Sequence, residues 1–240
     1  MSATDSRCAA ISVSIDLVVS RPGFDLEVTV EVAAGETLAI VGPNGAGKST
    51  MLDAIAGHAV IDRGRIRLGD VTVADGEIHV PAEERALSVV RQDPLLFPHL
   101  DVHHNVEFGL RARGIGSADR RRRTESALDA VDLRRLADAR IDELSGGQAQ
   151  RASLARSLVV DQPLLLLDEP LSRVDVANRR LIRSVLDGVA ATQIIVTHGK
   201  DHALDCNRVL AIEGGRVVAL TTPSELMADP PTAWLAELLG

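Results

Sequence analysis

Two glycine-rich stretches of this chain contain the residue types that bind phosphate groups. The first, GPNGAGKST, matches the pattern G-x-x-x-x-G-K-[ST], in which glycines let backbone amides face phosphate oxygens. In that pattern Lys48 reaches the β- and γ-phosphates, and the Ser49 hydroxyl ligates Mg²⁺ beside a helix N-terminus. An apolar run before the loop and a helical run after it argue against a chance glycine-rich turn. The predicted phosphate-binding residues are Gly42, Pro43, Asn44, Gly45, Ala46, Gly47, Lys48, Ser49 and Thr50.

The second stretch is LSGGQ, from Leu144 to Gln148, and it lies far along the chain from the first. A serine and two glycines before the helical run AQRASLARSLVV are typical of an anion site at a helix N-terminus. Taken alone, the five residues are reasonably explained by a helix cap with a flexible glycine entry, but the full set of motifs is not. Two phosphate sites so far apart in one chain need an explanation.

Two acids follow the apolar run PLLLL, namely Asp168 and Glu169. Asp168 suits Mg²⁺, directly or through water. Glu169 stands one residue further on, past the strand tip, where it can accept a proton from an attacking water as a general base. A strand end followed by a solvated turn would explain the two acids alone, but the phosphate loop favours phosphate hydrolysis.

The elements that position these residues alternate between strand and helix. Residues 11–34 alternate between apolar and polar and predict two antiparallel strands joined at Arg21-Pro22-Gly23. Apolar runs at 37–42, 163–169 and 193–198 predict buried parallel strands, with a helix in VANRRLIRSVLDGVA between the last two. Residues 93–143 show helical spacing in NVEFGLRARG and RTESALDAVDLRRLADA, with Leu128, Val131 and Leu136 on one face. The tail, PSELMADPPTAWLAELLG, predicts short helices around a Pro-Pro turn.

Composition limits the classes of partner. The 240-residue chain has a formal net charge of −8, which argues against a nucleic-acid partner. Its one basic cluster, Arg120–Arg123, is better explained as the solvent-exposed start of a helix than as a nucleic-acid-binding patch. Cys8 and Cys206 have no metal or redox spacing, so a reducing compartment is expected. We find neither a signal-peptide pattern nor an apolar run long enough to span a bilayer. We therefore expect a soluble chain whose membrane role, if it has one, requires a partner.

Six motifs and residues follow one another in this order along the chain: GPNGAGKST, Gln92, LSGGQ, LLLLDEP, Asp175 and His198. Together they resemble the nucleotide-binding subunit of an ABC transporter over nearly the whole chain. The resemblance implies an α/β P-loop NTPase fold with a RecA-like core, an N-terminal antiparallel β subdomain and an inserted helical subdomain. It implies a single ABC ATPase domain over 1–240. The core and β subdomain would occupy 1–92 and 160–240, and the helical subdomain with the LSGGQ motif would occupy 93–159.

The resemblance also answers why one chain has two phosphate sites. In this family two copies pair head to tail, and each ATP lies between the phosphate loop of one copy and the LSGGQ motif of the other. The residues implied on that second side are Ser145, Gly146, Gly147 and Gln148. Gln92 is implied as the residue that senses Mg²⁺ and the attacking water, His198 as a contact to the γ-phosphate, and Asp175 as part of a loop that crosses the dimer interface.

The sequence departs from the family pattern in four places. The family usually has an aromatic ring that stacks on adenine at a position corresponding to Val19–Arg21, whereas this chain has no tyrosine and Phe24 comes a few residues late. We therefore expect adenine to stack on Arg21 or to pack on Val19. The other departures are Ala149 where a basic residue is usual, SRVD where SALD is usual, and Gly199 where an acid is common.

Leu95, Leu96 and Phe97 form an apolar knuckle close after Gln92, between Pro94 and Pro98. They either close the core of the helical subdomain or face a partner. The resemblance implies that an integral membrane permease docks near Gln92–Leu100, which would place the protein at the cytoplasmic face of the cell membrane. The segment PLLFPHL is similar in sequence to the ATPases of importers of oxyanions, iron, polyamines and sugars. Among these, we expect the transported substrate to be an oxyanion such as molybdate.

Two other classes remain as alternatives. A soluble ABC-type ATPase of DNA repair or translation would have no permease partner, but repair members contain a long coiled coil and translation members contain two cassettes in one chain. An unrelated P-loop kinase or GTPase would have no use for LSGGQ, and the sequence has no N-K-x-D guanine motif.

Overall fold

The alternating residues near the N-terminus form an antiparallel hairpin in the computed structural model, which describes residues 8–21 and 23–239. Strand β1 (Val13–Arg21) pairs along its whole length with β2 (Phe24–Val32), which confirms the predicted hairpin. Its apolar side is buried, whereas its polar side faces solvent. Of the predicted turn, Pro22 lies outside the described residues.

The hairpin belongs to the larger of two units, which comprises Ala9–Leu87, Pro163–Asp168 and Ala191–Gly240. The predicted apolar runs form β3 (Thr37–Val41), β7 (Leu164–Asp168) and β8 (Thr192–Val196), which pair in parallel and are almost entirely buried. The strands of this unit lie in the order β5-β4-β1-β2-β10-β9-β3-β8-β7. The remaining strands are β4 (Arg63–Leu68), β5 (Val71–Ala74), β9 (Arg208–Glu213) and β10 (Arg216–Thr221). The helices are α1 (Lys48–Ala56), α6 (Lys200–Leu204), α7 (Pro223–Ala228) and α8 (Ala233–Leu239), with a 3₁₀ turn at Ala82–Glu84.

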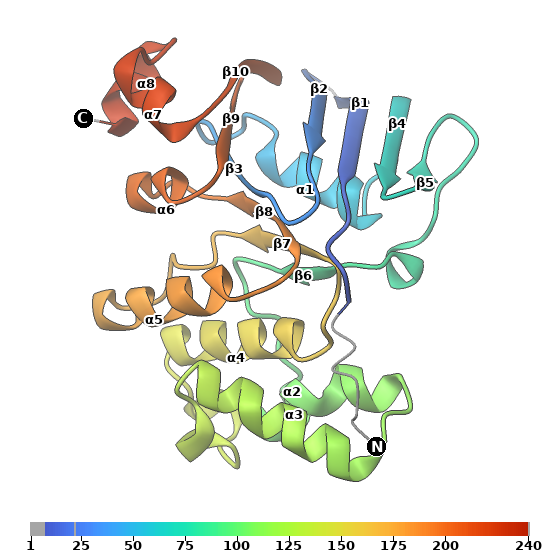
Figure 1. Cartoon of the computed structure of the whole chain (residues 1–240), viewed down its shortest axis with the longest axis vertical. Coiled ribbons are helices and arrows are strands. Elements are labelled where there is room, and N and C mark those ends of the chain that lie inside the picture. Colours follow the sequence, from blue (N-terminus) through green and yellow to red (C-terminus); the bar gives the residue numbers. More distant parts are fainter. Residues whose placement is uncertain (1–7, 22, 240) are drawn as a thin grey trace. The chain divides into compact units, whose positions relative to one another are not determined.

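The smaller unit comprises Met1–Cys8, Ser88–Gln162 and Glu169–Ala190, and Cys8 is the described part of its first segment. Helices α2, α3 and α4 pack on one another in this unit (Figure 1). Their shared core includes Val106, Leu128 and Leu154. Its elements are the short strand β6 (Ser88–Val90), the helices α2 (Val102–Ala112), α3 (Ser117–Ala130), α4 (Gly146–Leu158) and α5 (Val176–Asp187), and 3₁₀ turns at Arg134–Leu136 and Ile141–Glu143.

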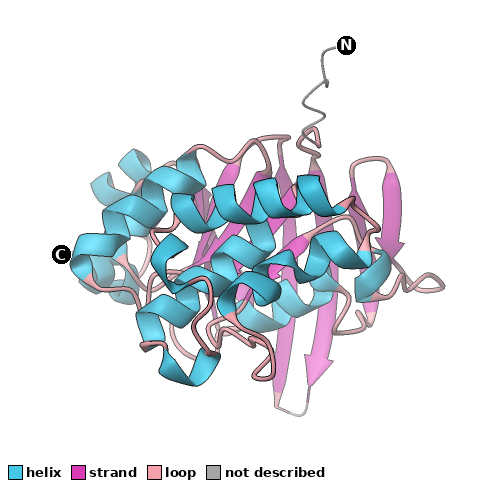
Figure 2. Cartoon of the chain, turned by 90° about the horizontal axis from the view of Figure 1, so that it is seen from below, coloured by secondary structure: helices cyan, strands magenta, loops and turns pink. Residues whose placement is uncertain are grey.

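The helix predicted over RTESALDAVDLRRLADA begins earlier and ends earlier than its periodicity suggested. It ends at Ala130 because Asp132 takes a left-handed φ of 54°, and Leu136 then lies in a separate 3₁₀ turn. Helices dominate the smaller unit and strands the larger one. Figure 2 distinguishes the helices, in cyan, from the strands, in magenta. Within the described ranges 8–21 and 23–239, no helix has both the length and the apolar character needed to cross a bilayer.

A buried arginine fixes the end of α1, the helix that follows the phosphate loop. Arg85 is 3% exposed, and its guanidinium donates to the carbonyl oxygens of Ala54 and Ile55 at 2.7 Å. It also donates to Val80 at 2.8 Å and Val73 at 3.1 Å. Arg85 thus satisfies carbonyls at the C-terminus of α1, where a helix has no acceptor partners of its own.

In the smaller unit, the N-terminus of α4 lies against the loop before α5. A Cβ added to Gly147 would stand 2.8 Å from the carbonyl oxygen of Arg173 and 3.6 Å from the Cα of Val174. A Cβ added to the neighbouring Gly146 would meet only the Cδ of Arg173, at 4.0 Å. The loop backbone therefore occupies the space of a side chain at Gly147 but leaves room at Gly146.

Replacing Arg85 with alanine is expected to destabilise the protein by roughly 2–4 kcal/mol, because buried carbonyls lose their donor. Urea unfolding followed by circular dichroism measures this loss. Arg67→Ala is the matched control, since Arg67 is exposed on β4 and its ion pair with Asp70 is worth about 1 kcal/mol or less. Similar losses in both variants would show that Arg85 does not fix α1.

Replacing Gly147 with alanine is expected to lower the free energy of unfolding by about 1–3 kcal/mol, because the methyl group collides with backbone. Gly146→Ala should instead leave stability unchanged or raise it by up to about 1 kcal/mol, since alanine favours helix and space is available there. Urea unfolding of the pair gives the comparison, and equal stabilities would contradict the close packing.

Candidate functional site

The predicted phosphate loop connects β3 to α1. It turns through left-handed conformations at Gly45 and at Gly47, which has φ of 103° and stands immediately before the first residue of α1. The Lys48 ammonium is buried at 6% exposure and donates to the carbonyl oxygens of Gly42, at 2.8 Å, and Pro43, at 2.9 Å. These bonds hold the positive charge over the loop, beside the backbone amides at the helix N-terminus. Asn44, Gly45 and Ser49 are exposed, so the loop is open to a ligand.

The strand register brings two more candidate residues to the same edge of the sheet. Ile40 of β3 pairs with Val196 of β8, and Val196 pairs with Asp168 of β7. Gly42 and His198 each lie two residues beyond this row. Because the three strands are parallel, Asp168, His198 and the phosphate loop share the carboxyl edge of the sheet, which is where such sheets bind ligands.

His198 is an exposed residue after β8. Partial desolvation of the ring, followed by the nearby Lys48 ammonium, lowers the pKa of His198 from its ordinary value of 6.5. The imidazole is therefore neutral at pH 7 and has one N–H donor and one acceptor nitrogen. Asp168 is 9% exposed, at the end of a fully buried strand.

Glu169 follows Asp168 directly and has a feature that the motif did not predict. Its backbone φ is 51°, a left-handed conformation that costs a residue with a side chain on the order of 1–3 kcal/mol. The Ser172 backbone N–H and hydroxyl both donate to the Glu169 carbonyl oxygen, at 3.1 and 2.9 Å, and hold this conformation. Strained backbone of this kind concentrates at functional sites.

LSGGQ forms the capped N-terminus of α4, in the smaller unit. The Ser145 hydroxyl accepts from the Gln148 backbone N–H at 3.3 Å, and the Gln148 side chain accepts from the Ser145 N–H at 2.8 Å. The helix-cap interpretation is therefore confirmed. It leaves the Ser145 O–H as a donor, together with the first-turn amides of Gly146 and Gly147, so capping and anion binding are compatible.

Asp175 also caps a helix. Its carboxylate accepts from the Asn178 backbone N–H at 3.0 Å at the start of α5, and from the Asn178 side chain at 2.8 Å. The side-chain bond, followed by the backbone bond, lowers the pKa of Asp175 from its ordinary value. Sequence reasoning gave this residue only an interface role and missed its structural one.

Gln92 is exposed in a segment that α4 and the loop before α5 hold from several directions. Gln150 of α4 donates to the Arg91 carbonyl at 3.2 Å, and Arg173 pairs with the Asp93 carboxylate at 2.5 Å. Arg156, also on α4, donates to the carbonyls of Pro94, at 3.0 Å, and Leu95, at 2.8 Å. Residues 91–95 are thus tied to the helix that begins with LSGGQ.

The apolar knuckle is divided between core and surface. Leu95 has a left-handed φ of 47° and is 67% exposed, whereas Leu96 and Phe97 are half-buried. The centroid of the Phe97 ring lies 4.5 Å from that of Phe108, which is 46% exposed. The Arg156 guanidinium stands 5.6 Å from the centroid of the Phe97 ring. Leu95 and Phe108 therefore present an apolar surface that packing within the unit does not cover.

The expectation that adenine packs on Val19 is wrong. Val19 is 0% exposed, because it points to the buried side of the β1–β2 hairpin. Arg21, the other residue considered there, is exposed at the end of β1.

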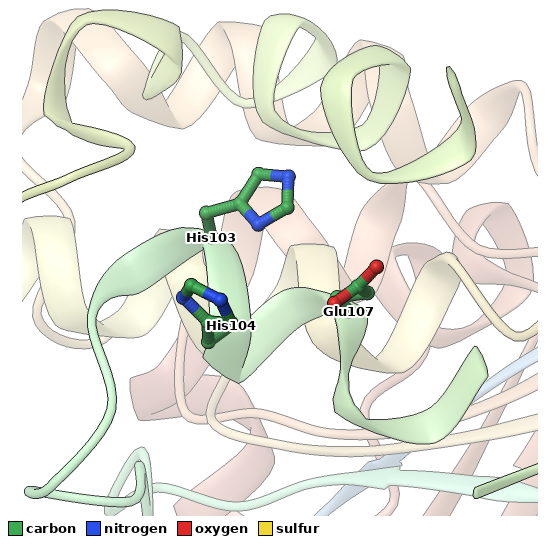
Figure 3. A group of neighbouring side chains, drawn as sticks. All are labelled: His103, His104 and Glu107. Carbon is green, nitrogen blue, oxygen red and sulfur yellow. The ribbon is translucent and has the colours of Figure 1, made fainter. Parts of the chain in front are cut away.

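One further cluster has the donor types of a transition-metal site. His103, His104 and Glu107 lie on α2 with donor atoms within 4.8 Å of one another, but the two imidazoles leave the helix in different directions (Figure 3). Glu107 pairs with Arg120 at 2.8 Å, and Nδ1 of His104 lies 2.8 Å from the Asp101 carboxylate. Because Glu107 and His104 already have these partners, we do not assign the cluster to a metal site.

The predicted residues therefore fall into two groups. The phosphate loop, Asp168 and His198 share one edge of the larger unit, whereas Gln92, Glu169, LSGGQ and Asp175 belong to the smaller one. Sequence reasoning missed the left-handed Glu169 backbone, which a turn to Ser172 holds. It also missed the Arg173–Asp93 pair, which joins residues far apart in the chain.

Comparison with solved structures supports the fold. The chain is similar to the ATP-binding cassette MJ0796 in a dimeric post-hydrolysis state bound to ADP and Pi, with a TM-score of 0.78 and 25% identity over 89% of this chain and 98% of that one. It is also similar to a bacterial Atm1-family ABC exporter with ATP bound, with a TM-score of 0.83 and 26% identity over 98% of this chain and 43% of that one. The predicted P-loop NTPase fold is confirmed.

Curated relatives share more of the sequence. The chain is 42% identical over 90% of its length to the molybdenum import ATP-binding protein ModC of Mycobacterium tuberculosis, and spans 61% of that protein. It is 42% identical over 89% of its length to the spermidine/putrescine import ATP-binding protein PotA of Frankia alni, of which it spans 46%. It is 39% identical over 89% of its length to the Fe(3+) ions import ATP-binding protein FbpC of Serratia marcescens, of which it spans 63%.

The chain therefore spans less than two thirds of these relatives' own length. A family profile described as "ABC transporter" matches residues 26–172, from the second strand of the hairpin through the phosphate loop and LSGGQ to the acids after β7. The phosphate loop, Asp168 and His198 at one edge of the sheet and the shared fold agree with this match. The chain belongs to the ABC transporter family as an ATP-binding domain.

Proposed function

We propose that this chain binds and hydrolyses ATP to power a membrane importer. The observation that carries the proposal is the common edge on which the Lys48 loop, Asp168 and His198 meet. A nucleoside triphosphate in that loop would have its γ-phosphate beside a buried ammonium, a carboxylate and a neutral imidazole. This combination suits phosphate hydrolysis, because charge develops on the γ-phosphate oxygens.

Each residue has a distinct part in the proposed reaction. The loop amides and Lys48 bind and orient the phosphates, and the His198 N–H donates to a γ-phosphate oxygen. Glu169 accepts the proton of the attacking water, and its left-handed backbone conformation orients its carboxylate for this role. The exposed Ser49 hydroxyl and the Asp168 carboxylate are the hard oxygen ligands that Mg²⁺ prefers, and the Gln92 amide oxygen is a third. When bound there, Mg²⁺ would neutralise charge on the β- and γ-phosphates.

We further propose that the second phosphate site serves a second copy of the chain. The N-terminus of α4 carries a serine hydroxyl and the first-turn amides of Gly146 and Gly147, which have no acceptor within the helix and suit a γ-phosphate. In a head-to-tail dimer, Ser145, Gly146, Gly147 and Gln148 of one copy would close over ATP held in the loop of the other, and Asp175 would lie at the interface. The dimeric state of MJ0796 supports this arrangement by analogy.

The third part of the proposal concerns a membrane permease that docks at Gln92–Leu100. Its support is the exposed apolar surface at Leu95 and Phe108, and the bonds of Arg156 to the Pro94 and Leu95 carbonyls. A push on Leu95 would reach α4 through Arg156, and hence the LSGGQ end of that helix. The protein would then work at the cytoplasmic face of the cell membrane.

We propose an oxyanion such as molybdate as the transported substrate, after the relative ModC. Relatives named for iron, spermidine/putrescine and sulfate/thiosulfate import have 37–42% identity, so iron and polyamines are the nearest competitors. The alternative class, a soluble ABC-type ATPase without a permease, would have no need for an exposed Leu95 surface.

The role assignments make a first prediction about ATP. Lys48→Ala is expected to abolish most ATP binding, because the charge on the β- and γ-phosphates is lost. Glu169→Gln should bind ATP as the natural chain does but hydrolyse it roughly 10²–10⁴ times more slowly, since only the proton acceptor is removed. Equilibrium binding and single-turnover hydrolysis separate the two effects. An equal loss of binding in both variants would contradict these roles.

A second prediction tests docking. Replacing both Leu95 and Phe108 with serine is expected to leave the melting temperature and basal ATP hydrolysis nearly unchanged, because Leu95 is 67% exposed and Phe108 is 46% exposed. It should abolish co-purification with the proposed permease when the two proteins are expressed together. Val71→Ser is the matched control, since Val71 is 60% exposed on β5. A double variant that still co-purifies would remove the proposed docking surface, and one that melts early would mean that these residues are core.

A further inference from the structure

An arginine in the loop before α5 lies alongside the N-terminus of α4, within the smaller unit. The carbonyl oxygen of Arg173 stands 2.8 Å from the position that a Cβ of Gly147 would take. Its Cδ stands 4.0 Å from the position that a Cβ of Gly146 would take. The backbone of Arg173 is therefore packed on the first turn of α4, and its side chain passes that turn on the side of Gly146.

The guanidinium at the end of this side chain is bound to a carboxylate next to Gln92. Nη2 of Arg173 donates to Oδ1 of Asp93 at 2.5 Å. The Arg173 side chain is 45% exposed and that of Asp93 is 71% exposed. Because water screens a pair as exposed as this one, the pair contributes little to stability, and a stronger anion can displace the carboxylate.

The groups of α4 that would meet a γ-phosphate are themselves uncharged. They are the Ser145 hydroxyl and the first-turn amides, and the residue after LSGGQ, Ala149, adds no charge. A γ-phosphate has more negative charge than a carboxylate, and a planar guanidinium can donate two parallel hydrogen bonds to it. Since the Cδ of Arg173 already borders Gly146, rotation of the last bonds of the side chain can bring the guanidinium to this helix end.

We propose that Arg173 exchanges Asp93 for the γ-phosphate of the ATP held by a second copy of the chain. The inference rests on the proposed head-to-tail site and adds a positive charge to its LSGGQ side. It also gives that site an effect on Gln92, because Arg173 is one of the side chains that hold residues 91–95. When the guanidinium turns to the phosphate, Asp93 is released, and the segment that contains Gln92 loses a restraint while ATP occupies the closed site.

The exchange is measured through the dissociation constant of the dimer formed with ATP and Mg²⁺. Light scattering is done on the full chain in a Glu169→Gln background, so that ATP is not hydrolysed. Arg173→Ala is expected to raise the constant by roughly tenfold or more, because a charge-assisted contact to the γ-phosphate is lost. Asp93→Asn should lower it by up to about fivefold, since the guanidinium no longer has to leave a carboxylate. The double variant should behave as Arg173→Ala does.

The opposite signs of the two single variants separate this exchange from a structural role. A pair that only holds the loop in shape is broken equally by either change, so both variants would then weaken the dimer by similar factors. Arg173→Lys should retain part of the effect, because it keeps the charge but loses the planar fork. Arg121→Ala is the matched control. Arg121 is exposed and pairs with Glu125 at 2.8 Å on α3, so its loss should change the dimer constant by no more than about twofold.

Two further measurements show whether Arg173 acts only in the dimer. At protein concentrations well below the dimer constant, Arg173→Ala should bind MgATP within about twofold of the background chain, because Lys48 and the loop amides are unchanged. The melting temperatures of the Arg173 and Asp93 variants should stay close to that of the background chain, since both side chains are exposed.

Two outcomes would overturn the inference while leaving the proposed function intact. A dimer constant unchanged in Arg173→Ala would mean that the guanidinium does not meet the γ-phosphate. Weaker dimers in both Arg173→Ala and Asp93→Asn would mean that the pair serves only the shape of the loop. A background chain that binds ATP but stays monomeric would instead contradict the proposed head-to-tail site, and this inference with it. One that binds no ATP would contradict the proposed ATP function.

Discussion

The backbone of the phosphate loop is packed so closely that its surroundings leave no room for side chains at its two ends. A Cβ at Gly42 would stand 2.2 Å from the carbonyl oxygen of Ile212 in β9, and one at Gly47 would stand 2.8 Å from Phe24 and Leu26 of β2. The loop is therefore in close contact with two strands of the same sheet, β9 and β2, between which β10 lies. The burial of β3, the carbonyls that hold Lys48, and the arginine that caps α1 all serve to keep this short segment in place.

In the smaller unit, the N-terminus of α4 is likewise fixed by close backbone packing at a glycine. Gly147 lets the loop before α5 approach to a distance that no side chain permits, and Ser145 and Gln148 fix the helix end through a reciprocal cap. Gln150 and Arg156 then connect the same helix to the segment that contains Gln92 and Leu95. In the proposed mechanism, this rigid helix links the surface that faces the permease to the residues that face ATP.

The sequence predicted the parts of the site that are local. The phosphate loop, LSGGQ and the acids after β7 are each defined by a few neighbouring residues, so short patterns were sufficient to find them. The hairpin was predicted from its alternation, but β4 and β5 were not, because their residues alternate too weakly. The helix ending at Ala130 was misjudged, since apolar spacing continues through Val131 and Leu136 while Asp132 turns the chain. The buried Arg85 and the ring of Phe24 at Gly47 depend on packing between distant segments, which no local pattern contains. The left-handed Glu169 was missed for another reason, because its conformation is held by a turn to Ser172 that the motif does not specify.

The central claim is that one ATP site is built from two copies of the chain, and mixing two inactive variants tests it most directly. Lys48→Ala disables the phosphate loop. Gly146→Asp places a negative charge at the α4 N-terminus, where the structure has room for a side chain. Each variant alone should lack ATPase activity. In an equal mixture, half of the dimers should pair the two variants and contain one intact site, so roughly a quarter of the natural activity should return. Activity no higher than the sum of the two separate preparations would contradict the account.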